Sequence, residues 1–218
     1  MIFSDVSAEL LDHCRHLASE MGVADRCVFV RASADDLSEL GDESVDVVTT
    51  RSVLIYVRAK DAVFREFHRV LRTGGRISLF EPINRYFADE PSSYWGFDVT
   101  EVLDLVEKLE TTYHTSNEDD PGPMMDFDQR DLFRMAEEAS FRSVGLDLEI
   151  RREPGSWVTS WEALLKTAGN PLDPTLEEAM QKVLTRDEAE RFEDHVRPQI
   201  ERGQGIKKWA FAYVFATK

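Results

Sequence analysis

Short β-branched segments alternate with amphipathic helical patterns over the first 81 residues, and this order narrows the possible folds more than any other feature. Residues 2–5 are mostly apolar and lead to Ser7, which is suited to be the N-cap of a helix. Further strands are predicted at Cys27–Val30, Val45–Thr49 and Ile77–Phe80, with a second helix before the last of them. Strand, helix, strand, strand, helix, strand implies right-handed crossovers and a parallel sheet. The chain is therefore predicted to be an α/β protein.

Both helical patterns have an apolar stripe that predicts a buried face. The stripe of the first comprises Leu10, Leu11, Cys14, Leu17, Ala18 and Met21, and that of the second comprises Ala62, Val63, Phe67, Val70 and Leu71. Arg69 and Arg72 suit the negative end of the second helix dipole, and Gly74 and Gly75 then permit the helix to stop. The strands near residues 27–30 and 45–49 are almost entirely apolar, so we expect both faces of each to be buried.

The second half of the chain is less regular. Residues 83–127 contain one helix candidate, Val99–Leu109, followed by an acidic stretch with Pro and Gly. Regular patterns resume with a helix at Asp128–Ala139 and a strand at Val144–Ile150. Residues 155–205 are predicted to be helical, with capping boxes that begin at Thr159, Thr175 and Thr185. Residues 209–218 form a last predicted strand.

The composition excludes several classes of function. Among 218 residues the formal net charge is −16, so a nucleic-acid backbone would be repelled and we expect no nucleic-acid partner. No apolar run approaches the ~20 residues that span a bilayer, so no membrane partner is expected either. Only Cys14 and Cys27 are present, which gives no disulfide framework, and a reducing cytoplasm is the expected location. His13 and His16 share a helix face with Cys14, but a solvated face explains them better than a metal site.

Four stretches of the first 82 residues resemble the class I S-adenosylmethionine-dependent methyltransferases, in particular their small-molecule branch. In chain order they are DVSAELL, ASADDL, SVDVVTTRSVLIYV and FREFHRVLRTGGRISLFEP. The fourth is the most specific, although Thr73 stands where the family usually has proline. The resemblance implies a Rossmann-like sheet that is mostly parallel with an antiparallel C-terminal strand. It also implies a single methyltransferase-like domain over residues 1–218, with residues 83–127 and 155–205 as helical insertions.

The resemblance assigns S-adenosyl-L-methionine as the cofactor and names residues that would bind it. Asp5 would accept hydrogen bonds from the ribose hydroxyls, and Ser33 and Ala34 would hold the adenine, largely through backbone groups. Asp35 or Asp36 could accept from the adenine amine, and either could equally be a solvated loop charge. The backbone carbonyl of Arg51 would face the methionine moiety, and its unusual side chain could reach an acidic acceptor.

The methyl acceptor is expected to be a small molecule. Tyr56 falls where the family commonly has a histidine, and Glu81 follows a parallel strand at the edge where such sheets bind ligands; Glu81 could equally be a turn residue. Tyr94 and Trp95 belong to an aromatic segment that we expect to cover the acceptor. Residues 83–127 and 155–205 would together form a lid over this edge, or else a surface excursion packed by its own aromatic side chains. Trp157, Trp161 and Trp209 are interpreted as core residues.

In this family the first strand and its glycine-rich donor turn lie roughly 20 residues before the acidic residue. Asp5 has only four residues before it, so both are expected to be absent from this chain, most simply because the sequence is a shortened version of a complete enzyme. The strands on either side of the missing one would then be unpaired or would pair directly. We therefore expect these 218 residues to bind S-adenosylmethionine very weakly and to show no turnover.

The function predicted from the sequence is methyl transfer to an O, N or C nucleophile of a small molecule. No general base can be assigned. A second interpretation is a methyltransferase-like binding or scaffold protein without catalysis. A third is an NAD-binding oxidoreductase, because an acidic residue after the second strand also serves NAD.

Overall fold

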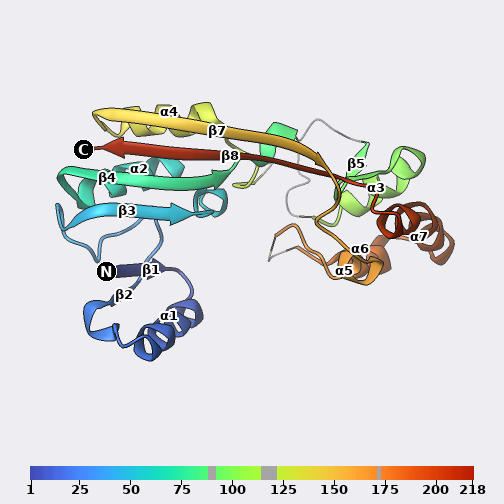
Figure 1. The fold of residues 1–218 in the computed structure, drawn as a ribbon, viewed down its shortest axis with the longest axis horizontal. Coiled ribbons are helices and arrows are strands. Elements are labelled where there is room, and N and C mark those ends of the chain that lie inside the picture. The colour runs from blue at the N-terminus through green and yellow to red at the C-terminus, as the bar shows by residue number, and fades with distance from the viewer. Residues whose placement is uncertain (88–91, 114–121, 171–172) are drawn as a thin grey trace. The chain divides into compact units, whose positions relative to one another are not determined.

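A computed structural model of the chain describes residues 1–87, 92–113, 122–170 and 173–218, which fall into two compact units. The first unit contains residues 1–81, 129–147 and 212–218, and the second contains residues 82–128 and 148–211. Three long strands contribute residues to both units: β4 (Leu71–Pro82), β7 (Ser143–Pro154) and β8 (Ile206–Thr217) (Figure 1). The two predicted insertions, residues 83–127 and 155–205, both belong to the second unit.

The first unit begins with a two-stranded parallel sheet of β1 (Ile2–Asp5) and β2 (Val28–Arg31), in which Asp5 is opposite Arg31. Helix α1 (Ala8–Glu20) connects them, followed by the short helix η1 (Ala24–Arg26). As predicted, Ser7 is the N-cap, and its Oγ accepts a hydrogen bond of 3.2 Å from the Leu10 N–H. Gly22 follows the helix with a φ of 66°, which costs glycine little.

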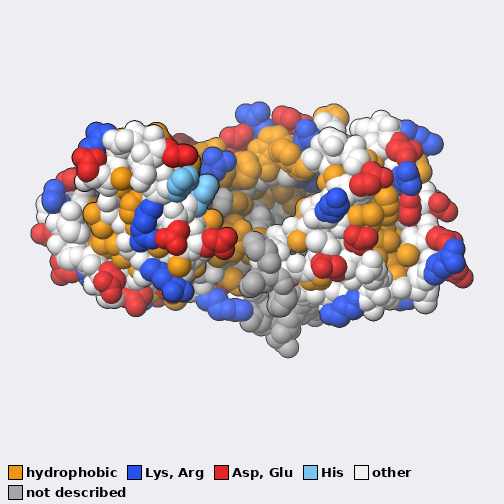
Figure 2. All heavy atoms as spheres, turned by 90° about the horizontal axis from the view of Figure 1, so that it is seen from below, with side chains coloured by type: hydrophobic (Ala, Val, Ile, Leu, Met, Phe, Trp, Pro, Cys, Tyr) orange, Lys and Arg blue, Asp and Glu red, His pale blue; other side chains and the backbone are white. Residues whose placement is uncertain are grey.

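The predicted burial of α1 is only half right. Leu11 and Ala18 are buried, whereas Leu10, Leu17 and Met21 are 54%, 42% and 74% exposed. Figure 2 shows the side of the molecule on which β1, β2 and α1 lie, and hydrophobic side chains reach its surface there. Because no other described element of this unit covers the second half of the stripe, α1 buries only the part that faces β1 and β2.

The second sheet of the unit has the strand order β3-β4-β8-β7. Strand β3 (Val45–Arg51) is parallel to β4, with Thr50 opposite Leu79 and Arg51 opposite Phe80. Strand β8 runs antiparallel to β4: Gly74 N–H donates to the Lys218 carbonyl, and Ile83 N–H donates to the Ala210 carbonyl. The predicted antiparallel C-terminal strand is confirmed. Figure 1 shows β1, β3 and β4 pointing the same way, so their carboxyl ends share one side of the unit.

One face of this sheet is packed more tightly than the other. On β8, Ala212 and Val214 are buried, whereas Tyr213 and Phe215 are 39% and 50% exposed, which is the period-two pattern of a strand. Helices α2 (Lys60–Val70) and α4 (Gln129–Glu138) contact each other and supply the core of the unit, with Phe64, Phe67 and Leu132 among its most buried side chains.

The expectation that β2 and β3 are buried on both faces is wrong. Val28 is 55% exposed and Val47 is 48% exposed. Among the described residues β1 pairs only with β2, and β3 pairs only with β4, so no backbone ladder joins the two sheets. Apolar composition indicates a tendency to be buried, but neighbouring elements decide whether a strand is covered. The expected absence of the family's first strand stays a prediction.

The second unit is built mainly from helices. They are η3 (Asn84–Phe87), η4 (Thr100–Val102), α3 (Leu103–Glu110), α5 (Trp161–Leu165), α6 (Leu176–Val183) and α7 (Arg186–Glu201). Their shared core includes Phe97, Leu105, Trp161, Phe192 and Val196. A hairpin of β5 (Ser93–Tyr94) and β6 (Phe97–Asp98) also belongs to the unit. At its turn, a Cβ on Gly96 would lie 2.4 Å from the Ile206 carbonyl oxygen, so only glycine fits.

Some of the capping boxes and core tryptophans predicted for this unit are confirmed, and others are wrong. The capping boxes of Thr175 with Glu178 and of Thr185 with Glu188 are confirmed. The one at Thr159 is wrong, because Ser160 is the N-cap of α5 and accepts from the Ala163 N–H at 3.1 Å. Trp161 is a core residue as predicted, but Trp157 is 62% exposed.

Candidate active site

Asp5, the predicted ribose ligand, lies at the carboxyl end of β1. Its Oδ1 accepts a hydrogen bond of 2.8 Å from the Ser7 N–H, which fixes the direction of the carboxylate. The Asp5 carbonyl oxygen accepts from the Ala32 N–H at 3.2 Å. This second bond brings Asp5 next to the start of the loop that follows β2. The predicted ribose and adenine residues are therefore neighbours.

The predicted adenine residues form a tight turn in the loop after β2. Ser33 Oγ donates to the Asp35 carboxylate, and the Asp36 N–H donates to the Ser33 carbonyl at 3.1 Å. Asp36 faces solvent, and its Oδ1 accepts from the Ser38 N–H at 3.2 Å. Hydrogen bonds from Ser38 lower the pKa of Asp36. Because Asp35 is engaged by Ser33, it is held in place within the turn rather than freely solvated.

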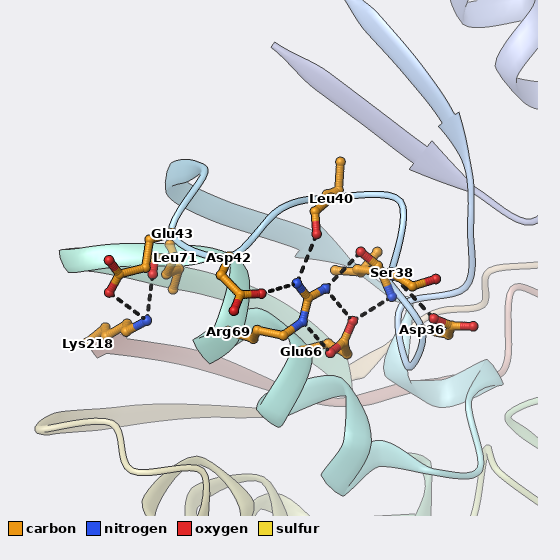
Figure 3. A network of polar contacts seen from close by, with 10 residues as sticks. Asp36, Ser38, Leu40, Asp42, Glu43, Glu66, Arg69, Leu71 and Lys218 are labelled. Atoms are coloured by element: carbon orange, nitrogen blue, oxygen red, sulfur yellow. Dashed lines mark hydrogen bonds and ion pairs between the residues drawn. The ribbon is translucent and has the colours of Figure 1, made fainter.

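The end of this loop is tied to α2 by an ion pair that the sequence pattern did not reveal (Figure 3). Arg69 Nε donates to Glu66 Oε1 at 2.7 Å, and Nη2 donates to Glu66 Oε2 at 2.8 Å. The same guanidinium donates to the carbonyls of Leu37 and Leu40 at 2.8 and 2.9 Å and to Asp42 Oδ1 at 2.7 Å. From the sequence we assigned Arg69 to the helix dipole. The i, i+3 spacing of Glu66 and Arg69 was the available signal.

Arg51 is the last residue of β3, and Tyr56 lies on the segment that follows it. The Arg51 guanidinium lies 5.0 Å from the centre of the Phe80 ring on the neighbouring strand, a cation–π contact. Phe80 in turn makes an edge contact with Tyr213 of β8, with ring centres 5.3 Å apart. Tyr56 belongs to the short helix η2 (Leu54–Tyr56) and is 52% exposed. Tyr56 is thus available to a ligand, and Arg51, which is also exposed, lies over the Phe80 ring.

Glu81, predicted as a second-rank substrate residue, has no exposed surface. Its Oε1 accepts from the Val53 N–H at 3.1 Å and from Thr50 Oγ1 at 3.4 Å, and its Oε2 accepts from the Leu54 N–H at 3.1 Å. Burial raises the pKa of the Glu81 carboxyl, and the backbone N–H groups partly oppose this rise. The carboxylate therefore holds the segment that carries Arg51 and Tyr56, where Ser52 has a φ of 54°. Direct contact of Glu81 with a substrate stays a prediction.

Tyr94 and Trp95 belong to the hairpin of the second unit. Tyr94 is 8% exposed and packs against Phe192 with ring centres 6.0 Å apart. Its hydroxyl oxygen lies 2.6 Å from that of Tyr113, and burial raises the pKa of Tyr94. Trp95 is half-buried against the same core and has a φ of 52°. Their predicted role in a lid over the first unit stays a prediction.

The part of the chain that the structure describes contains no candidate metal site and no candidate membrane-spanning helix. There, no group of three or more His, Cys, Asp or Glu side chains is placed to hold a metal ion. His16 instead lies 3.3 Å from Glu20 on the exposed face of α1. None of the described helices is long and apolar enough to cross a bilayer.

The first part of the chain is similar to known methyltransferases. Residues 2–79 match a family model described as a methyltransferase domain. The tRNA 5-carboxymethoxyuridine methyltransferase of Escherichia coli K12 is 32% identical over 79 residues, which are 36% of this chain and 30% of that protein. The ubiquinone/menaquinone biosynthesis C-methyltransferase UbiE of Hahella chejuensis is 36% identical over 81 residues, 37% of this chain and 32% of UbiE. Human thiol S-methyltransferase TMT1B is 36% identical over 76 residues, 35% of this chain and 29% of that protein. The chain thus matches only 29% to 32% of the length of these relatives.

Solved structures resemble the whole chain. A protein of Bacillus halodurans C-125, proposed to be a methyltransferase, has a TM-score of 0.55 at 18% identity, covering 100% of this chain and 82% of that one. The YcgJ protein of Bacillus subtilis has a TM-score of 0.56 at 15% identity, covering 100% of this chain and 81% of that one. At such identities the likeness shows the fold alone. The predicted α/β, Rossmann-like fold is confirmed.

Proposed function

We propose that the chain supports methyl transfer from S-adenosylmethionine to a small-molecule acceptor, because residues 2–79 match the model of a methyltransferase domain. The observation that carries the proposal is the position of Asp5. Its carboxylate stands at the end of a parallel strand and is oriented by the Ser7 N–H. Its backbone carbonyl accepts from the N–H of Ala32, the residue before the turn at residues 33–36. Among the described residues, Asp5 Oδ2 has no hydrogen-bond partner, so it can accept from a ligand hydroxyl.

The donor would be held by three segments of the first unit. Asp5 would accept from the ribose, the turn at residues 33–35 would enclose the adenine, and the backbone at Arg51 would face the methionine moiety. S-adenosylmethionine supplies an activated methyl group on a sulfonium, which an acceptor nucleophile displaces in line. The protein's contribution is therefore chiefly positioning, with reacting atoms brought to ~3–3.5 Å. All three segments are held by hydrogen bonds within the protein itself, which supports this assignment.

The acceptor is proposed to be a small molecule with an O, N or C nucleophile. One matched relative is named as a tRNA methyltransferase, but the net charge of −16 opposes binding of a polynucleotide to this chain. Tyr56 is the exposed candidate on the first unit for contact with the acceptor. Tyr94, Trp95 and the segments 83–127 and 155–205 are proposed to complete the acceptor pocket as a lid.

Donor binding by these 218 residues alone is proposed to be weak. The glycine-rich turn that would open a helix after a central strand has no counterpart among them: Gly74 and Gly75 lie within β4, and Gly22 ends a helix. A non-catalytic binding role is the second candidate, and the exposed apolar half of α1 is the observation that favours it. Binding of NAD by an oxidoreductase is the third candidate.

Titration followed by NMR separates these proposals, because chemical shifts detect weak binding. We expect S-adenosylmethionine, and not NAD, to shift resonances near Asp5 and residues 33–36. Asp5→Ala should weaken this binding by about 1.5–3 kcal/mol, the range for a charged hydrogen bond. Asp12→Ala is a matched control, since Asp12 pairs only with Arg15 on the surface of α1.

Three results of this titration would each contradict one of the proposals. Unchanged donor affinity in Asp5→Ala would refute the ribose assignment. Micromolar affinity of the wild-type chain would refute the proposal of weak binding. Binding of NAD in preference to S-adenosylmethionine would replace the methyltransferase proposal by an oxidoreductase.

A further inference from the structure

Arg69 is saturated by hydrogen bonds. A guanidinium has five N–H donors, and all five of them are used here: two on Glu66, one on Asp42 and two on the carbonyls of Leu37 and Leu40. Three of these acceptors belong to residues 37–42, which follow the turn at residues 33–36 along the chain. Figure 3 shows that the loop curves around the guanidinium so that its oxygens point inward. One side chain of α2 therefore defines the path of a segment that has no regular secondary structure.

Glu66 and Arg69 together form a clamp on this loop. Glu66 Oε2 accepts a hydrogen bond of 2.7 Å from the Leu37 N–H, while Arg69 binds the Leu37 carbonyl. The Leu37 side chain is 5% exposed, so its backbone N–H, its carbonyl and its side chain are all fixed. At the other end of the turn, the Ala32 N–H is bonded to the Asp5 carbonyl. The predicted adenine turn is thus anchored immediately before and immediately after its own residues.

The chemistry of the pair suits a permanent anchor. The side chains of Arg69 and Glu66 are 28% and 19% exposed, which reduces the competition from water. The hydrogen bond from Arg69 lowers the pKa of Glu66, and Glu66 together with Asp42 raises the pKa of Arg69. Both groups therefore stay ionised at neutral pH. Lysine could not replace Arg69, because an ammonium has three donors and lacks the planar fork that matches a carboxylate.

We infer that Glu66 and Arg69 are positioning residues that preset the turn at residues 33–36 in the shape that receives the adenine of the methyl donor. The inference rests on the proposed function for the identity of the ligand. A loop that is already ordered loses less conformational freedom on binding, so an intact clamp raises donor affinity without touching the donor. Neither residue is proposed to contact substrate.

The test uses Arg69→Lys and Glu66→Gln in the full 218-residue chain. Arg65→Lys is the matched control, because Arg65 lies one turn earlier on the same helix and, among the described residues, pairs only with Asp61. Amide hydrogen exchange is measured first, without ligand. The two clamp variants should exchange at least about tenfold faster over residues 36–40, with the exchange of α7 unchanged, and the control should match the wild type. Circular dichroism verifies that each variant is folded.

The second measurement is titration with S-adenosylhomocysteine, followed by NMR. The dissociation constant should rise about tenfold in both clamp variants and stay constant in Arg65→Lys. Unchanged exchange over residues 36–40 would overturn the inference. Faster exchange with unchanged affinity would also overturn it, while leaving the proposed function intact. If the wild-type chain itself gave no response at any concentration, the proposed function would fail, and the donor-directed role of the clamp would fail with it.

Discussion

Replacement of Glu81 by alanine should destabilise the first unit strongly. The side chain has no exposed surface, and its carboxylate accepts from the N–H groups of Val53 and Leu54 and from the Thr50 hydroxyl. In Glu81→Ala the Leu54 N–H is left buried without an acceptor, at about 1–3 kcal/mol, and the part-buried Val53 N–H adds a smaller penalty. We therefore expect the free energy of unfolding to fall by about 2–4 kcal/mol.

The assay must report on the correct unit. The four tryptophans are at positions 95, 157, 161 and 209, all in the second unit, so their fluorescence is not suitable. Denaturant unfolding followed by far-ultraviolet circular dichroism, together with amide exchange over residues 52–56, detects the change at the site. Glu137→Ala is the control, because Glu137 is exposed on α4 of the same unit and should change stability by less than ~0.5 kcal/mol. A loss in Glu81→Ala no larger than in this control would show that the carboxylate does not hold the segment.

Three further predictions follow from buried or capping groups. Because burial raises the pKa of Glu81 above its ordinary 4.5, the folded state keeps a proton that the unfolded chain has released. The contribution of Glu81 to wild-type stability should therefore fall as pH rises from that value to the folded pKa, and Glu81→Gln should make the fall of stability over this range smaller in a pH series of denaturant titrations. Phe192→Ala empties a site with no exposed surface and should cost about 3–5 kcal/mol by tryptophan fluorescence; a change below that of Tyr86→Ala, at an exposed ring, would contradict this. Thr185→Ala should cost about 1 kcal/mol in the same assay, whereas Thr159→Ala, which removes no cap, should cost nothing measurable.

Features encoded by neighbouring residues were predictable from the sequence. The Ser7 cap and the boxes at Thr175 and Thr185 each need only a side chain and a backbone N–H three residues away. At α5 the serine beside Thr159 offered the same chemistry, and the pattern could not choose between them. Strand β4 begins at Leu71, before Gly74 and Gly75, although those glycines suggested a break. Leu71 pairs with Val45 of β3, and Gly74 and Gly75 pair with Lys218 of the C-terminal end. These long-range pairs decide the boundary, and they leave no local pattern in the sequence.

Some residues of the candidate site were likewise predictable from the sequence, and others were not. Asp5 and residues 33–35 came from a family resemblance, and the structure brings these residues together through one backbone hydrogen bond. The clamp was missed because Arg69 reaches Leu37 and Asp42 across 32 and 27 positions of the chain. Glu81 was recognised by its strand-end position, but its burial follows from the way the segment after β3 folds over it. Spacing in the sequence does not determine such contacts.

The place of β8 has a consequence for the order in which the chain folds. Among the described strands β8 is the last in sequence, yet it lies between β4 and β7. During synthesis, β3 and β4 can pair and recruit α2 as soon as they leave the ribosome, but β7 has no partner strand until residues 206–217 follow. In that interval the edge of β4 exposes a row of unpaired backbone groups, which is a template for pairing with another nascent chain. Premature termination before residue 206 would make this edge permanent, so such fragments should aggregate rather than accumulate as a smaller folded protein.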